Sequence, residues 1–197
     1  MKKQNHFTIM YLLPLLLLNF MVVSLNEKKI KVRLDDYLSD SKHDKTKLRT
    51  VLESGSMDGH FKSQELYDLF FYLQKQYPEY VTSEKIGTTV EKRKIYAFKL
   101  NKPNANKKLV QKSKMLFTGA HHARELLTAT IVLKIFVESL HSLIYDSEKS
   151  SFWIFNDLII VPLVNLDSHT FISKAFGTSN WDDHKYKRKN MNRKYCS

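Results

Sequence analysis

The sequence predicts an α/β fold, a mixed twisted sheet flanked by helices, on three observations. Residues 115–117, Met-Leu-Phe, form a short apolar run of the kind found in a buried strand. Residues 126–143 follow with apolar side chains at helical spacing, which predicts a long helix that packs on the sheet. Residues 157–164, DLIIVPLV, are almost continuously apolar over the length of a strand buried on both faces. Pro162 inside that run predicts an edge position or a bulge for this strand.

The first 24 residues predict a secretory signal peptide. Lys2 and Lys3 precede an apolar run over residues 7–23, and Pro14 in its middle disfavours a stable spanning helix. We expect cleavage after about Ser24, so that no stable membrane span remains and the protein is secreted, extracellular or lumenal. An uncleaved signal anchor is the alternative.

Residues 25–58 are charged and poor in apolar side chains, which predicts a polar linker, and a globular domain is expected over residues 59–197. Within it, Ser63 is expected to cap a helix that Pro78 ends. Residues 86–89 predict a turn and residues 94–99 alternate like a strand.

The remaining segments carry most of the positive charge. The net charge of +12 is spread through loops and indicates a surface feature, and residues 103–114 predict a surface loop. Residues 181–197 combine basic and aromatic side chains, but the signal peptide argues against nucleic acid as a partner. A solvated basic tail is the simplest alternative. The single cysteine, Cys196, excludes an internal disulfide.

The turn between the strand at 115–117 and the following helix carries the candidate chemistry. His122 and Glu125 offer an imidazole and a carboxylate, both zinc donors, three residues apart. His121 and Glu125, four apart, are the rival pair, and spacing does not decide between them. A solvated turn with Glu125 as a helix cap is the third interpretation.

Residues 119–125, GAHHARE, resemble the G-x-H-x-A-R-E signature of the zinc carboxypeptidases, the M14 metallopeptidases. The resemblance implies that His122 and Glu125 bind one Zn²⁺ and that Arg124 lies in the substrate site. Residues 187–190, KRKN, resemble the W-R-K-N-R segment of the family, which implies that Arg188 supports the oxyanion. Residues 165–169, NLDSH, resemble N-P-D-G-Y, and residues 65–96 resemble the opening of the family domain.

This resemblance implies a secreted zinc carboxypeptidase that removes C-terminal residues from peptides or proteins. Residues 59–197 would be the truncated, N-terminal part of the catalytic domain, without the third zinc ligand and the general-base glutamate. We therefore expect an incomplete activity and an exposed sheet edge. A non-catalytic secreted pseudoenzyme or peptide- or metal-binding fragment is the alternative, and a related zinc amide hydrolase is a third. Three histidines remain as substitutes for the third ligand, although their spacing gives no support: His141, His169 and His184.

Overall fold

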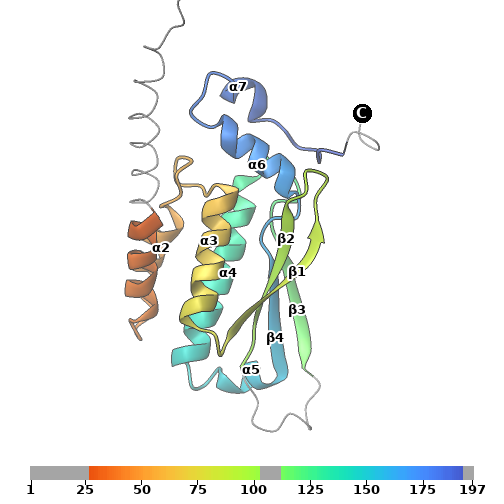
Figure 1. Ribbon diagram of the computed structural model, residues 1–197. Coiled ribbons are helices and arrows are strands. Elements are labelled where there is room, and N and C mark those ends of the chain that lie inside the picture. Colours follow the sequence, from red (N-terminus) through yellow and green to blue (C-terminus); the bar gives the residue numbers. More distant parts are fainter. Residues whose placement is uncertain (1–26, 103–111, 193–197) are drawn as a thin grey trace, which may run out of the picture.

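A mixed four-stranded sheet organises the computed structural model, which describes residues 27–102 and 112–192 (Figure 1). Its order is β1-β2-β4-β3. Both β1–β2 and β2–β4 pair antiparallel, whereas β3 and β4 pair parallel. The strands are β1 (Val81–Thr88), β2 (Lys94–Leu100), β3 (Ser113–Thr118) and β4 (Asn156–Val161). The predicted mixed α/β fold is confirmed.

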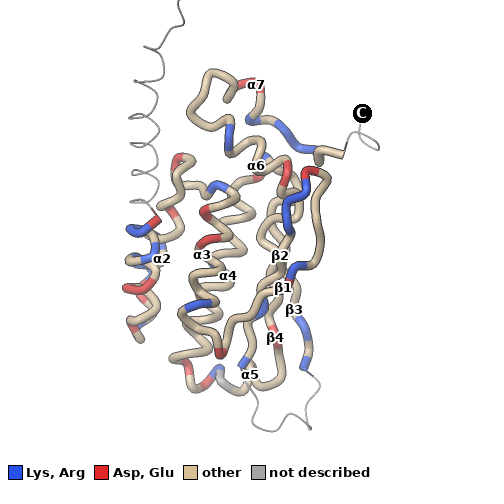
Figure 2. The backbone as a smooth tube through the Cα atoms, viewed as in Figure 1, with Lys and Arg blue, Asp and Glu red and all other residues tan. Residues whose placement is uncertain are grey.

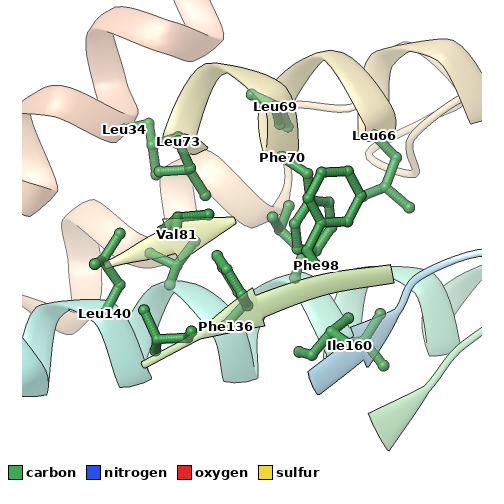
Figure 3. Close-up of a cluster of buried hydrophobic side chains, with 14 of the residues drawn as sticks. Leu34, Leu66, Leu69, Phe70, Leu73, Val81, Phe98, Phe136, Leu140 and Ile160 are labelled. Atoms are coloured by element: carbon green, nitrogen blue, oxygen red, sulfur yellow. The ribbon is translucent and has the colours of Figure 1, made fainter. Parts of the chain in front are cut away.

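Two long helices, α3 (Ser63–Gln76) and α4 (Leu126–Tyr145), cover one face of the sheet (Figure 1). Between helices and sheet, Phe70 stacks on Phe98 with ring centres 4.7 Å apart and meets Phe136 edge-on at 5.1 Å (Figure 3). Such aromatic pairs bury large apolar areas in preferred geometries. In the described part of the chain, α4 alone has the length and apolar composition of a membrane span, and half of that stretch is buried.

The segment predicted as a polar linker is instead folded from residue 27 onward. Residues 27–38 are helical, and α2 (Lys45–Leu52) follows. Their apolar side chains are few but recur at helical spacing, so each helix has one buried stripe. The buried residues are Ile30, Leu34, Tyr37, Leu38, Leu48 and Val51. Composition was the wrong criterion here, because periodicity decides whether a short apolar set can pack. The predicted signal peptide at residues 1–24 lies outside the described residues.

Two local expectations about strands are wrong. The turn predicted at residues 86–89 largely belongs to β1, which continues to Thr88 across a register shift between Lys85 and Gly87. The strand carrying Pro162 is not at an edge, because β4 pairs with strands on both sides. It ends at Val161, so Pro162 lies just beyond the ladder and costs it no hydrogen bond.

One edge of the sheet, formed by β3, exposes apolar side chains. β3 is an edge strand among the described residues, and its Leu116 and Phe117 are 62% and 40% exposed. This is the expected exposed edge. At the opposite end of the sheet from the β3–α4 turn, α5 (Ser150–Phe155) leads into β4, and beyond the carboxyl end of β4 lie α6 (Leu166–Ala175) and α7 (Trp181–His184) (Figure 1).

Candidate active site

The site begins where the parallel strands β3 and β4 end side by side. The backbone N–H of Gly119 donates to the Val161 carbonyl at 2.9 Å, and the Val164 N–H donates to the Gly119 carbonyl at 3.0 Å. A Cβ on Gly119 would lie 2.6 Å from the carbonyl oxygen of Pro162, so only glycine permits this approach. The turn that follows is thereby held against the end of β4.

The next residue, Ala120, adopts a left-handed conformation with φ of 50°, which is costly for a residue with a side chain. The Thr128 hydroxyl holds it there: it accepts the Ala120 N–H at 3.0 Å and donates to the Glu125 carbonyl at 2.7 Å. Asn165 also donates its backbone N–H to the Ala120 carbonyl at 3.0 Å. One hydroxyl on the first turn of α4 therefore closes the turn over residues 120–125.

Within this turn, the structure brings Glu125 against His122 and not against His121. His122 Nδ1 lies 2.8 Å from Glu125 Oε1, whereas His121 Nε2 lies 2.7 Å from the Thr118 hydroxyl. The side chains of His122 and Glu125 are 36% and 43% exposed. Glu125 occupies the N-cap position of α4 but makes no side-chain capping bond, so the interpretation as a helix cap is wrong. The pair is open to solvent at the rim of the sheet.

The pair fits two positions of a zinc site by donor type, since an imidazole nitrogen and a carboxylate oxygen face each other across a short gap. Within residues 27–102 and 112–192, no three His, Cys, Asp or Glu side chains gather closely enough to hold a metal ion. Catalytic zinc ordinarily has three protein donors. The described residues therefore provide two of them.

The three histidines considered as substitutes lie elsewhere. His141 Nε2 is 2.6 Å from the Asp40 carbonyl, and the ring of His184 stacks on Phe171 at 4.4 Å. His169 is fully buried, with Nδ1 2.8 Å from the Ser63 hydroxyl, so Ser63 contacts α6 and does not cap α3. Burial lowers the pKa of His169 to about 4 and keeps it neutral.

The segment that carries Arg188 crosses this turn. The Arg188 carbonyl accepts the Ala123 N–H at 3.4 Å and a side-chain N–H of Asn165 at 3.2 Å. A cavity of about 520 Å³ has both His122 and Arg188 in its lining, while Arg124 and Glu125 are not part of that lining. Figure 2 shows the basic stretch after α7 passing beside α6 and the tip of the β1–β2 hairpin.

The two candidate arginines are exposed. In the part of the chain that the structure describes, neither the Arg124 nor the Arg188 guanidinium has a hydrogen-bond or ion-pair partner. A guanidinium presents five donors in a planar fork that matches carboxylates and oxyanions. Both groups are therefore available to a ligand, and Arg188 is one of the residues that line the cavity.

Sequence reasoning missed how α6 is tied to the hairpin. The buried carboxylate of Asp167 accepts the Thr89 hydroxyl at 2.7 Å, the Glu91 N–H at 3.0 Å and the Arg93 guanidinium at 2.5 Å. The partners lie more than seventy positions earlier in the chain, so no local pattern indicates the contact. This bridge fixes the hairpin next to the cavity.

Comparison with known proteins gives a consistent family. The family model described as zinc carboxypeptidase matches residues 66–197. Carboxypeptidase O from Bos taurus is 25% identical over 123 residues, which are 62% of this chain and 32% of that protein. The inactive metallocarboxypeptidase ECM14 from Saccharomyces cerevisiae is 28% identical over 125 residues, 61% of this chain and 26% of that protein.

Solved structures agree on the fold. Thrombin activatable fibrinolysis inhibitor superposes with a TM-score of 0.58 at 19% identity, covering 81% of this chain and 36% of that one. Carboxypeptidase A from Helicoverpa armigera gives 0.55 at 22% identity, covering 86% and 37%. The chain thus spans about a third or less of the length of the curated relatives it matches.

Proposed function

This chain belongs to the zinc carboxypeptidase family, and we propose that it serves zinc-dependent removal of C-terminal residues from peptides or proteins. The observation that carries the proposal is the His122–Glu125 pair, which lies at the carboxyl end of β3 beside the cavity that Arg188 lines. Ligand sites of open α/β sheets are commonly found at this edge. We assign residues 59–197 to the N-terminal part of the catalytic domain and residues 1–24 to a secretory signal.

His122 Nδ1 and Glu125 would hold the metal. When bound, zinc supplies a Lewis acid that polarises a carbonyl and lowers the pKa of a bound water. The 2.8 Å contact between the two side chains supports this role, because their donor atoms already converge on one place. His121 is held by Thr118 and would remain outside the metal shell.

Arg188 and Arg124 would act on the substrate. A free guanidinium can stabilise negative charge that develops on a carbonyl oxygen, and the presence of Arg188 in the cavity lining supports that role. Arg124, exposed on the same turn, would contact the peptide or its terminal carboxylate. Protein or peptide C-termini are therefore the proposed partners, and secretion rests on the sequence of residues 1–24.

A second candidate is a non-catalytic member of the family that binds a peptide or a metal ion. Its support is that only two zinc donors converge among the described residues, and that one relative is named an inactive metallocarboxypeptidase. It differs from the first candidate in chemistry but not in the residues that would bind.

The experiment is zinc titration of the full chain by calorimetry, together with hydrolysis of blocked dipeptides that differ in their C-terminal residue. We expect stoichiometric zinc binding that His122→Ala and Glu125→Gln each weaken at least about tenfold, and hydrolysis that a chelator abolishes. His184→Ala is the matched control, because His184 stacks on Phe171 away from the pair. Zinc binding without hydrolysis supports the second candidate. Binding that survives both substitutions contradicts the proposed metal site.

A further inference from the structure

Asn165 stands between the two halves of the proposed site, and we infer that it is a positioning residue that fixes Arg188 relative to the His122–Glu125 turn. The inference rests on the proposed function for its catalytic consequence. Its structural part stands on hydrogen bonds that exist without metal or substrate.

The carboxamide of Asn165 has two N–H groups, and two backbone carbonyls face it. Nδ2 lies 3.3 Å from the His121 oxygen and 3.2 Å from the Arg188 oxygen. One carbonyl directly precedes the proposed ligand His122, and the other belongs to the proposed oxyanion residue. A single side chain therefore spans both halves of the site.

Burial strengthens the two hydrogen bonds of the Asn165 carboxamide. Asn165 is only 8% exposed, so water competes poorly for its N–H groups, and an unpaired buried carbonyl would carry a desolvation cost. The backbone of Asn165 is fixed as well, because its N–H donates to the Ala120 carbonyl at 3.0 Å. The carboxamide thus starts from a rigid point at the end of β4.

Among the described residues, few other hydrogen bonds reach Arg188 itself. Residues 187–192 form neither helix nor strand, so no ladder or helix holds them. Near the turn, this stretch is attached by the long backbone bond from Ala123 to Arg188, 3.4 Å, and by the Ser168 hydroxyl, which donates to the Lys189 carbonyl at 2.7 Å. The bond from Ser168 ends on Lys189, so Arg188 itself is linked to the turn by Ala123 and by Asn165.

The consequence concerns catalysis more than binding. A guanidinium that stabilises developing charge must be placed accurately, and a misplacement of about 1 Å can cost orders of magnitude in rate. Losing the Asn165 bridge would leave the groups that bind zinc and the peptide in place while Arg188 drifts. The effect should therefore fall on kcat.

The first test does not depend on activity. Hydrogen exchange of the Ala123 amide is measured by NMR on the full chain, for wild type, Asn165→Leu and Asn165→Ser, which keeps one donor. We expect exchange about tenfold faster in Asn165→Leu, the equivalent of one lost hydrogen bond, and an intermediate value in Asn165→Ser. Thr170→Val is the control, because it removes a bond from α6 to Ser63 that touches neither half of the site. Unchanged exchange in Asn165→Leu, with Thr170→Val indistinguishable from it, overturns the inference.

The second test is a double-mutant cycle on dipeptide hydrolysis with Asn165→Leu and Arg188→Ala. We expect Asn165→Leu to lower kcat at least about tenfold with KM changed less than about twofold, and to have little further effect once Arg188 is alanine. Fully additive losses overturn the positioning role. If the chain does not hydrolyse peptides, the proposed function fails, and the exchange experiment still decides whether Asn165 holds the two halves together.

Discussion

Two regions of the molecule differ in burial. The core lies between the sheet and its helices and is closed to solvent, whereas the candidate site at the end of the sheet is open to it. In the core, Phe70, Phe98 and Phe136 are fully buried, and the ring of Phe70 contacts the rings of the other two. At the candidate site, the side chains of His122 and Glu125 are about four-tenths exposed, and among the described residues each has the other as its side-chain hydrogen-bond partner. Stability and the proposed chemistry would therefore depend on different residues, and substitutions should separate the two.

The largest effect is expected from removing a ring in the core. Phe136→Ala should lower the free energy of unfolding by about 3–5 kcal/mol, because it removes apolar contacts and leaves a cavity. Urea unfolding measures it. Ile131→Ala on the same helix is the control, since Ile131 is 44% exposed and should cost much less. Equal losses in the two variants would contradict the contrast between core and surface on α4.

The buried His169 should make the stability of the fold sensitive to acid. His169 has a pKa of about 4 in the folded protein against about 6.5 when unfolded, so the unfolded chain binds the proton more readily. Stability is full above pH 6.5 and falls as the pH drops towards 4, by about 3 kcal/mol in all.

Unfolding curves at several values between pH 7 and 5 measure this dependence, in a range where most carboxylates stay charged. His169→Gln should show a much flatter profile, since glutamine does not titrate. A profile that is identical in the variant would show that His169 is not the responsible group. Besides burial, which is the larger cause, the neighbouring His60 lowers the pKa of His169.

Gly119 lies at the boundary between the two regions and should affect both. Gly119→Ala places a Cβ 2.6 Å from the Pro162 carbonyl, so we expect a loss of about 1–3 kcal/mol together with weaker zinc binding. Gly87→Ala is the matched control, because its nearest neighbour would be a flexible Ile95 side-chain carbon at 3.9 Å. Unfolding and zinc titration measure the two effects. A destabilised variant with unchanged zinc affinity would separate the turn from the metal pair.

The smallest effect on stability is expected at the site itself. His122→Ala removes one partly exposed side chain with a single hydrogen-bonded partner among the described residues, so the free energy of unfolding should change by less than about 0.5 kcal/mol. His141→Ala, which loses a buried ring and a bond to the Asp40 carbonyl, should cost clearly more. Thermal unfolding of both variants compares them. A large loss in His122→Ala would mean that the pair is structural.

The sequence predicted those parts of the molecule that local patterns determine. Helix α4 and strands β2 and β4 were identified from periodicity and apolar runs. The turn over residues 119–125 was identified from its resemblance to a family motif. The helices over residues 27–52 were missed, because their apolar residues are sparse and were judged by composition. For Pro162, the rule for strand interiors was applied to a residue just outside the strand.

The site was predicted in part for the same reason. The His122–Glu125 contact is local and could be proposed from spacing. The structure was needed to decide whether His122 or His121 faces Glu125. The hydrogen bonds of Asn165 and Asp167 involve partners in distant segments, which no window of sequence contains. Long-range hydrogen bonds thus explain most of what the sequence left open.

The strand order β1-β2-β4-β3 also has a kinetic consequence. β1 and β2 are neighbours in the chain and can form their hairpin early, whereas β4 must reach β2 across β3, α4 and α5. Closing such a long loop is slow, because its entropy is lost before the new contacts compensate for it. The strands whose ends hold the candidate site, β3 and β4, are therefore expected to join the sheet last. During that interval the apolar residues of β4 and the edge of β3 are open to association between chains, which makes refolding yield dependent on protein concentration.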